Sequence, residues 1–311
     1  MKKISIVVSV FNEEGNITKL LKEIGNAQIQ DYEYEIIFVN DCSTDQSETI
    51  IKKACKFDSS IKLITFTRNY GHEIAMSAGM DIATGDAVIF MDADLQHPPH
   101  IMRDMIEKWE QGKKIVLTNR TDNQENSISY KIMSTIYYKV LNSLSDFNMK
   151  ANSPDFRLVD KYYIDLLKKF KENSRLFRGL LYLIDAKHDT YTIDFIAPRR
   201  FSGETKYNFS KLFNLAIDSI IAFSVKPLRI SLILSSIVFA LSIFYGIFIF
   251  LYWVIADTTI AGLTTQILST IILGSANLLV LSIVGEYVGR IHLESKNRPL
   301  YTVRDAVNCE K

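Results

Sequence analysis

Short apolar runs alternate with polar segments along the first hundred residues. Four runs have the length and composition of buried β-strands, and they cover residues 4–10, 35–39, 62–66 and 87–91. Apolar residues between the runs recur at helical spacing, as in Ile17, Leu20 and Ile24. This alternation predicts an α/β fold with a mostly parallel sheet and helices on both faces. A further amphipathic helix is expected at about 128–145.

Two much longer apolar stretches follow in the last third of the chain. Ile230 to Ala256 and Thr258 to Gly285 contain no charged residue, and each exceeds the roughly 20 residues that cross a bilayer. A buried hairpin of a soluble protein is disfavoured, because a core helix seldom needs such length. We therefore expect two transmembrane helices, joined by a polar turn at Asp257.

Basic residues flank the two stretches and are missing from the turn between them. Lys226 and Arg229 precede the first stretch, and Arg290, Lys296 and Arg298 follow the second. By the positive-inside rule, both termini are expected in the cytoplasm. The amphipathic segment 209–224 is interpreted either as a helix on the bilayer surface or as an ordinary domain helix.

These patterns divide the chain into parts with different expected environments. In order, they are a cytoplasmic catalytic domain at 1–208, a juxtamembrane amphipathic helix at 209–227, a transmembrane hairpin at 228–290 and a cytoplasmic tail at 291–311.

Composition excludes several classes of protein. The net charge of +1 gives no global field for nucleic acid. The three cysteines, Cys42, Cys55 and Cys309, show neither zinc spacing nor an even-numbered disulfide framework, so a reducing compartment is expected. No HExxH, GxGxxG or Walker A pattern occurs. The apolar N-terminus is short and is interpreted as a strand rather than a signal peptide.

Acidic and amide side chains follow two of the predicted strands. Asn40 and Asp41 come after the second strand, and Asp92 and Asp94 come after the fourth. Ligands of parallel α/β sheets bind beyond the carboxyl ends of strands. Paired carboxylates form a hard oxygen site suited to Mg²⁺ or Mn²⁺, which can neutralise a diphosphate. An Asp-x-Asp motif alone is weak evidence for a metal site, so the segments around it are needed to interpret its function.

Those surroundings resemble a known family over nearly the whole chain. The matching segments are SIVVSVFNEE at 5–14, VNDCSTD at 39–45, RNYG at 68–71, ATGD at 83–86, DADLQHPP at 92–99, SPDFRL at 153–158 and RFSGETKY at 200–207. With the two terminal apolar helices, they resemble family 2 glycosyltransferases of the polyprenyl-phosphate branch. That branch includes dolichol-phosphate mannosyltransferases and bactoprenol glucosyltransferases.

The resemblance implies a GT-A fold, which is Rossmann-like and binds a nucleotide-sugar. It also implies roles for individual residues. The nucleotide-sugar pocket would contain Ser9, Phe11, Glu13, Asp41 and Asp92. The metal ligands would be Asp92, Asp94 and Gln96, with Asp94 also counted as catalytic.

This chain departs from the family pattern at three positions. Ser9 stands where the family usually has Pro, and Asn40 stands where it has Asp. Cys42 replaces Gly, from which we expect a turn that does not need a positive φ angle.

On the acceptor side, basic side chains are needed to bind the negative charge of a lipid phosphate. The candidates are Arg120, Lys131, Arg200 and Lys206, and solvated surface charge is the alternative interpretation. Asp155 is the further catalytic candidate. It fits a general base, but a phosphate monoester is already anionic at neutral pH, so an orienting role is slightly favoured.

The expected reaction is an inverting transfer of a hexose to a polyprenyl phosphate, which forms a lipid-linked sugar for cell-envelope glycan modification. UDP-glucose and undecaprenyl phosphate are the default pair, while GDP-mannose, UDP-galactose and N-acetylhexosamine donors stay open. The expected location is the inner membrane, among lipids and possible further copies of the chain. The alternatives are a processive polysaccharide synthase, disfavoured because no QxxRW motif occurs, and a non-catalytic scaffold that binds lipid phosphate.

Overall fold

The computed structural model describes most of the chain in two compact units. The described residues are 1–121, 154–170, 181, 184, 188–198, 226–256 and 262–309. One unit comprises Met1–Asn142, Phe147–Leu212 and Pro299–Lys311 and contains the sheet; the other comprises Ser143–Asp146 and Phe213–Arg298 and contains two long helices. The helices predicted at 128–145 and 209–224 lie outside the described residues.

The sheet is centred on the strands predicted from the apolar runs. They are β1 (Lys2–Val10), β2 (Tyr32–Asn40), β3 (Ile61–Phe66) and β4 (Ala87–Asp92). They lie parallel in the order β4-β1-β2-β3, connected by α1 (Glu14–Ala27), α2 (Ser47–Phe57) and α3 (His72–Ile82). The predicted β-α-β-α order is confirmed, and each strand is one to four residues longer than its apolar run.

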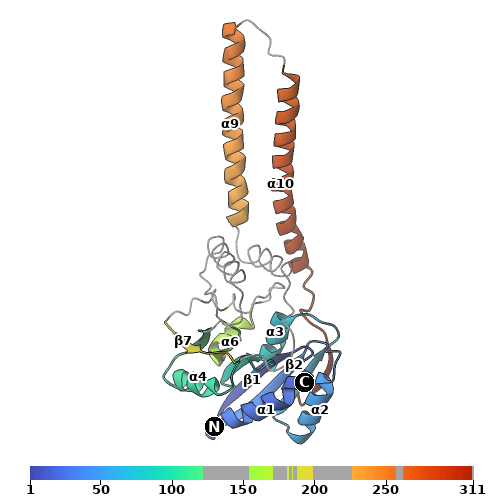
Figure 1. Ribbon diagram of the computed structural model, residues 1–311, viewed down its shortest axis with the longest axis vertical. Helices are drawn as coiled ribbons and strands as arrows, with labels where there is room; N and C mark the ends of the chain where they lie inside the picture. Colours follow the sequence, from blue (N-terminus) through green and yellow to red (C-terminus); the bar gives the residue numbers. More distant parts are fainter. Residues whose placement is uncertain are drawn as a thin grey trace. The chain divides into compact units, whose positions relative to one another are not determined.

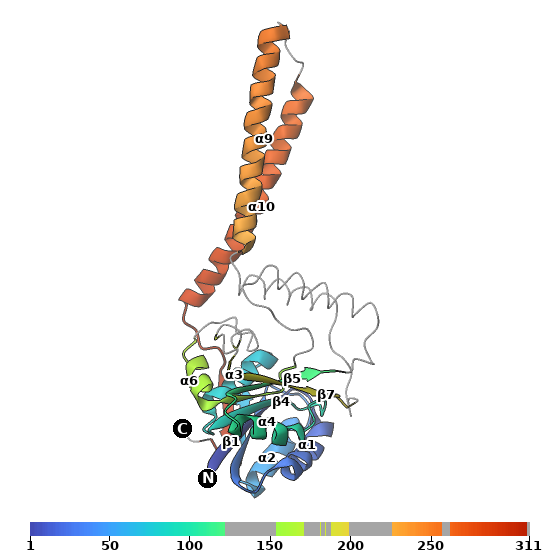
Figure 2. The same ribbon diagram turned by 90° about the vertical axis from the view of Figure 1, so that its left-hand side faces the viewer.

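Helices cover both faces of the sheet, as predicted (Figure 1). Ile4, Ile6 and Val8 of β1 belong to the core cluster that contains the buried sides of α1, α2 and α4 (Ile101–Glu110). On the opposite face, α3 lies close to β1, because a Cβ on Gly79 would come within 2.2 Å of Val7 Cγ1. A glycine is therefore required for this approach, and α3 appears above the sheet in Figure 2.

Four further strands extend the sheet that the sequence patterns predicted. They are β5 (Ile115–Arg120), β6 (Arg157–Asp160), β7 (Thr190–Phe195) and β8 (Val303–Val307). The complete order is β7-β5-β6-β4-β1-β2-β3-β8. Because β6 runs antiparallel to both β4 and β5, β5 points the same way as β4. The short helix α6 (Lys161–Leu167) follows β6.

Strand β8 lies after the long helices in the sequence but belongs to the same sheet as β1–β7. It pairs antiparallel with β3, from Leu63 opposite Val307 to Phe66 opposite Val303. Arg304 and Asp305 within it carry charge on the exposed edge, which discourages pairing with a further chain. Part of the segment expected as a tail is thus a strand.

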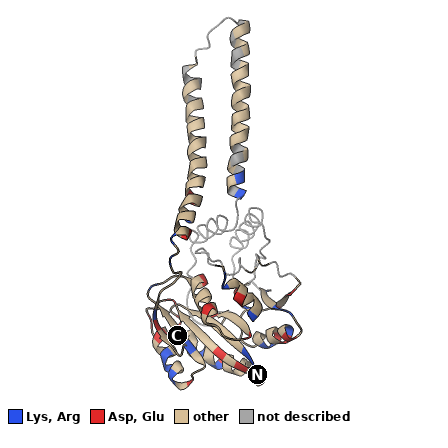
Figure 3. Ribbon diagram, turned by 180° about the vertical axis from the view of Figure 1, so that it is seen from behind, with Lys and Arg blue, Asp and Glu red and all other residues tan. Residues whose placement is uncertain are grey.

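The helical unit contains α9 (Lys226–Ala256) and α10 (Leu263–Ser295). Figure 3 shows that charge on these helices is confined to their ends. Both predicted apolar helices form, and α10 continues beyond Gly285. Among the described residues, Ser269–Ser295 is long and apolar enough to cross a membrane, and α9 contains a shorter apolar stretch, Ser235–Phe248.

Many large apolar side chains of these helices are exposed among those that the structure describes. Phe239 of α9 is 68% exposed and Leu278 of α10 is 67% exposed. Such a large apolar surface marks a membrane or protein contact.

Candidate functional site

The predicted donor-side residues meet at one edge of the sheet. In the register, Ser9 lies opposite both Asp92 of β4 and Val39 of β2, and Val10 lies opposite Asn40. Strands β2 and β4 flank β1, so the chain changes direction across the sheet at this point. Open α/β sheets bind ligands at such a switch point, beyond the carboxyl ends of the strands.

The loops after β1, β2 and β4 each contain a non-glycine residue in the left-handed conformation. These residues are Asn12 (φ 57°), Cys42 (φ 59°) and Leu95 (φ 63°). For residues other than glycine and asparagine this conformation costs about 1–2 kcal/mol. Strained residues of this kind cluster at functional sites.

Our expectation for Cys42 was therefore wrong. The turn needs a positive φ even though a cysteine occupies it. The turn is closed by two hydrogen bonds, one from Ser43 N to Asn40 Oδ1 (3.1 Å) and one from Asp41 N to Val10 O (2.9 Å). These bonds hold the backbone on either side of Cys42 in this conformation.

Asp41 lies at the edge of the candidate site, where the backbone of a neighbouring loop contacts it. Its side chain is buried, and its two oxygens accept hydrogen bonds from Tyr70 N (2.6 Å) and Gly71 N (2.9 Å). Burial raises the pKa of this carboxyl, and the two backbone N–H groups offset part of the rise. Asp41 thereby ties the end of β2 to the loop that begins α3.

The two carboxylates after β4 differ in their surroundings. Asp92 Oδ1 is buried and has no hydrogen-bond donor within the described part of the chain, although the side chain as a whole is 34% exposed. Asp94 is buried, and its Oδ1 accepts a hydrogen bond from Gln96 N (3.0 Å), which fixes the turn.

This set of oxygen atoms fits a divalent cation. Asp92 offers an oxygen that lacks a hydrogen-bond donor, and Asp94 lies two residues away on a fixed turn. Among the described residues, no group of three or more His, Cys, Asp or Glu side chains is arranged to hold a metal. The site has two carboxylates and an amide, so substrate oxygens would complete the coordination of Mg²⁺.

His72, the first residue of α3, joins three candidate residues that are far apart in the sequence. Its Nδ1 lies 2.7 Å from Ser9 Oγ, and its Nε2 lies 3.5 Å from Asp92 Oδ1 and 3.4 Å from Asp155 Oδ2. Burial lowers the pKa of His72, but the carboxylates of Asp92 and Asp155 outweigh this and raise it to about 10. The imidazolium is therefore the counter-ion of both carboxylates.

His72 was not among the site residues predicted from the sequence. The available indication was its position directly after the Arg68–Gly71 segment, at the start of the helix that follows β3. The helix dipole disfavours a cation there, so the two carboxylates stabilise the imidazolium against that field.

Asp155 lies at the same edge because β6 begins there. It is buried, and its Oδ1 accepts a hydrogen bond from Arg157 Nη2. Arg157, only 1% exposed, also donates to Pro154 O (3.1 Å). These contacts give Asp155 fixed partners on the side where the acceptor is expected, which suits an orienting role.

The remaining predicted residues are placed as follows. Phe11 is 36% exposed, and Glu13 begins the turn into α1, its N donating to Ser47 Oγ (2.9 Å). Arg120 ends β5, at the same edge as Asp92 but beyond β6. Three predicted lipid-phosphate ligands lie outside the described residues, namely Lys131, Arg200 and Lys206.

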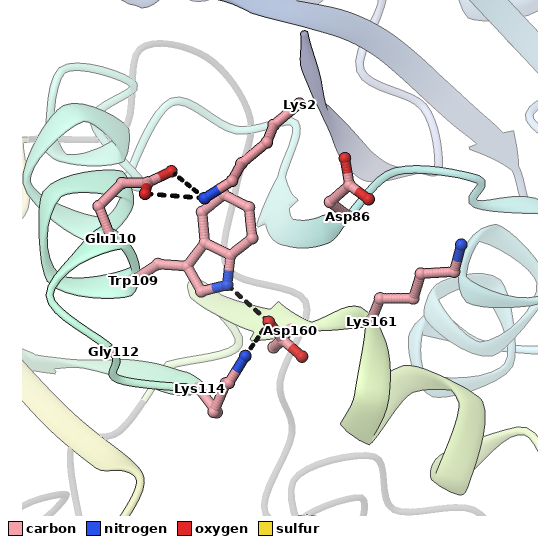
Figure 4. Close-up of a pocket in the computed structure, with 8 residues that line it drawn as sticks. All are labelled: Lys2, Asp86, Trp109, Glu110, Gly112, Lys114, Asp160 and Lys161. Carbon is pink, nitrogen blue, oxygen red and sulfur yellow. Dashed lines mark hydrogen bonds and ion pairs between the residues drawn. The ribbon is translucent and has the colours of Figure 1, made fainter.

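A depression of about 480 Å³ opens at the opposite edge of the sheet (Figure 4). It lies near Lys2 at the start of β1 and Asp86 just before β4. Lys114 pairs with Asp160 there (3.0 Å), and Lys2 pairs with Glu110 (2.8 Å). Because these charged side chains are paired with one another, we interpret this depression as a part of the fold that holds elements together rather than as a binding site.

Comparisons with known proteins show the family of the chain. The family model described as "Glycosyl transferase family 2" matches residues 5–167. The Bacillus subtilis glycosyltransferase YkcC is 37% identical over 307 residues, which cover 98% of this chain and 94% of that protein. The bactoprenol glucosyl transferase of Shigella phage SfV is 35% identical over 304 residues, with 97% and 98% covered.

A solved structure, the mannosyl-3-phosphoglycerate synthase of Rubrobacter xylanophilus, has a TM-score of 0.51 at 13% identity and covers 73% of this chain and 74% of that one. Fold and site together define a GT-A-like α/β glycosyltransferase of the nucleotide-sugar type. The chain belongs to glycosyl transferase family 2.

Proposed function

We propose that this glycosyltransferase moves a hexose from a nucleotide-sugar to a polyprenyl phosphate with inversion at the anomeric carbon. The default pair is UDP-glucose and undecaprenyl phosphate, and the lipid-linked product would supply cell-envelope glycan modification. Similarity to bactoprenol glucosyl transferases over nearly the whole chain supports this acceptor. The observation that carries the proposal is the position of His72 between Asp92 on the donor side and Asp155 on the acceptor side.

On the donor side, the proposed pocket is formed by residues after β1 and β2. Phe11, which is partly exposed, presents a ring to the base. Ser9, Glu13 and Asp41 would supply polar contacts, with Asp41 buried beneath the loop that begins α3.

Asp92, Asp94 and Gln96 would hold Mg²⁺ or Mn²⁺, which would supply positive charge to the departing nucleoside diphosphate. This assignment is supported by the partly exposed carboxylate of Asp92 at the end of β4 and by Asp94 on the turn that follows it. Among the chain's own residues, Asp94 keeps the turn rigid, and the His72 imidazolium balances the carboxylate of Asp92.

The proposed chemical step is a single in-line displacement. An oxygen of the acceptor phosphate attacks the anomeric carbon while the bond from that carbon to the diphosphate oxygen breaks. The phosphate is already anionic, so no base has to remove a proton. Asp155 therefore orients the acceptor and Arg157, and Arg120, Lys131, Arg200 and Lys206 would hold the acceptor phosphate.

The position of β8 supports an even number of membrane crossings. Strand β8 pairs with β3, so both lie on the same side of any membrane. If α10 crosses the bilayer, the chain between β7 and α10 must also cross, and the 31-residue α9 is long enough. We propose that α9 and α10 form a transmembrane hairpin with both termini cytoplasmic.

We accordingly propose that 1–208 is the catalytic domain, 209–227 the juxtamembrane helix, 228–290 the hairpin and 291–311 a cytoplasmic segment. The location would be the inner membrane, where the chain can form homo-oligomers.

The test is transfer by the purified full-length protein. Undecaprenyl phosphate is incubated with a panel of labelled nucleotide-sugars, with and without Mn²⁺, and label is counted in the organic phase. One donor should label the lipid with a single sugar, and replacement of Asp94 by Ala should lower the rate by about 100-fold or more. The matched control is Asp104→Ala, an exposed residue of α4, which should leave the rate unchanged.

Other outcomes point to the alternatives. A labelled polymer would indicate a processive synthase. Equal labelling by the wild type and Asp94→Ala would remove the metal assignment, and no labelling with any donor would favour a scaffold.

A further inference from the structure

The segment that follows α10 contacts β3 and the loop that leads from β3 to α3, next to the candidate donor site. Residues 299–307, which we name the strap, include β8 and the residues just before it. The pairing between β8 and β3 shifts in register between Thr65 and Phe66, where β3 ends. Just past that point, Thr67 N donates a hydrogen bond to Thr302 O (3.0 Å). The strap thus continues alongside the loop that leads to α3.

One strap side chain contacts this loop, and a second contacts the elements on either side of it. The Tyr70 hydroxyl donates to Thr302 Oγ1 (3.0 Å), and the Tyr301 hydroxyl donates to Asp81 Oδ2 of α3 (3.1 Å). The Tyr301 ring also stacks on Phe66 at 5.1 Å, and Phe66 packs edge-on against Tyr70 at 5.4 Å. The end of β3, the loop and α3 are therefore all joined to the strap.

The same loop holds Asp41 from its other side. Tyr70 N and Gly71 N donate to the two carboxylate oxygens of Asp41, and the Asn69 side chain donates to Asp41 O (3.3 Å). Gly71 has a φ of 97°, a conformation that side-chain-bearing residues seldom adopt. A continuous path of contacts runs from Thr302 through Tyr70 to Asp41.

We propose that Tyr301 and Thr302 are positioning residues of the donor site. They hold the 67–71 loop in the arrangement in which its backbone N–H groups fix Asp41. Neither side chain touches the donor, and both act through the loop. This inference rests on the proposed function, because it takes Asp41 as part of the nucleotide pocket.

The physical consequence is a change in donor binding rather than in the chemical step. Fixing the loop before binding removes an ordering cost that the donor would otherwise meet. Loss of one strap hydrogen bond should raise the donor KM by about 3- to 10-fold, the effect of a single hydrogen bond. The kcat at saturating donor and the KM for the lipid phosphate should stay within about twofold, because the hydrogen bonds described for the strap end on the 67–71 loop and on Asp81 of α3 rather than on Asp155.

The experiment uses full-length protein in detergent. UDP and GDP are titrated by calorimetry, the tighter one is kept as the probe, and donor kinetics are measured in parallel. Thr302→Val removes the hydroxyl and Tyr301→Phe removes the bond to Asp81 but keeps the stacked ring. Both should weaken nucleotide binding by about 3- to 10-fold, and Thr302→Ser, which keeps a hydroxyl, should restore it.

Two controls separate positioning from general loosening of the strand. Asp305→Asn weakens the exposed pair that β8 makes with Lys52 (2.6 Å) and should leave binding unchanged. Tyr70→Phe removes the bond to Thr302 together with the other bonds of the Tyr70 hydroxyl, so the double variant should be no worse than Tyr70→Phe alone.

The results that would overturn the inference are distinct from failure of the proposed function. In one outcome, Thr302→Val and Tyr301→Phe bind nucleotide as the wild type does while Asp41→Asn binds it more weakly. That result would contradict the positioning role of the strap but would still agree with the proposed donor pocket. Equally weakened nucleotide binding in Asp305→Asn and Thr302→Val would also contradict the positioning role of the strap. Unchanged binding in Asp41→Asn would contradict the donor pocket itself.

Discussion

Residues from distant parts of the sequence meet around His72. The meeting of Ser9 and Asp92 was predictable, because both follow strands whose carboxyl ends share an edge of a parallel sheet. The addition of His72 and Asp155 was not, because it depends on where α3 begins after β3 and on the antiparallel insertion of β6. Neither the start of α3 nor the antiparallel insertion of β6 can be predicted from a local pattern of apolar residues.

Replacing His72 by Ala should lower kcat/KM by about 10- to 100-fold, the usual effect of losing a residue that orients a ligand of a metal or substrate. The reason is that Asp92 and Asp155 would lose the cation between them. Transfer assays with the full-length protein check this. His100→Ala, at an exposed position before α4, is the control and should behave as the wild type. An unchanged rate in His72→Ala would exclude a role in orientation.

Glu35 is a buried carboxylate away from the candidate site, and it should make stability depend on pH. It is 1% exposed and contacts Lys3 (3.0 Å) and Lys62 (2.8 Å). Burial raises its pKa, but bonds from Lys62, Ser5, Thr84 and Lys3 outweigh this and lower it to about 2.

Because the folded-state pKa is depressed, the ionised Glu35 stabilises the fold above the unfolded-state pKa near 4.5. That contribution, about 3 kcal/mol, is lost as the pH falls from about 4.5 to 2. Unfolding free energies at pH 7 and pH 3 should therefore differ more for the wild type than for Glu35→Gln. Parallel pH profiles for the two proteins would contradict the prediction.

At the level of elements, local signals explain which strands were predicted. Strands β1–β4 are continuous apolar runs with helical spacing between them, so short-range patterns suffice. Strand β6 has four residues and includes Arg157 and Asp160, and β8 includes Arg304 and Asp305. Such strands depend on pairing with a partner strand, and the partner is distant in the sequence.

Asp160 joins three elements at the opposite edge of the sheet. It caps α6 by accepting from Tyr162 N (3.0 Å) and also accepts from Trp109 Nε1 of α4 (2.7 Å) and from Lys114 Nζ beside β5 (3.0 Å). Asp160→Ala should destabilise the sheet unit by about 2–3 kcal/mol through loss of the cap and the buried bond.

Thermal unfolding followed by circular dichroism measures this effect. The matched control is Asp165→Ala on the exposed side of α6, which should shift the midpoint little. Similar shifts for both variants would show that Asp160 has no special role.

At the level of the whole molecule, the pairing of β8 with β3 constrains how the chain can cross a membrane. If the hairpin spans the bilayer, Thr259→Cys between the helices should react with an impermeant maleimide from outside right-side-out vesicles. Asn297→Cys, after α10, should react only when the vesicles are opened. The native cysteines give the background. Reaction of both new cysteines from the same side would exclude the transmembrane hairpin.

The sequence alone determined the alternation of the first four strands with helices along the chain, the carboxylates beyond the strand ends and the two long apolar helices. These features depend on the spacing of residues that are close together in the chain. Only the tertiary structure decided the position of His72, the left-handed turn at Cys42 and the return of β8 to the sheet. These depend on hydrogen bonds between distant segments, whose partners a local pattern does not specify.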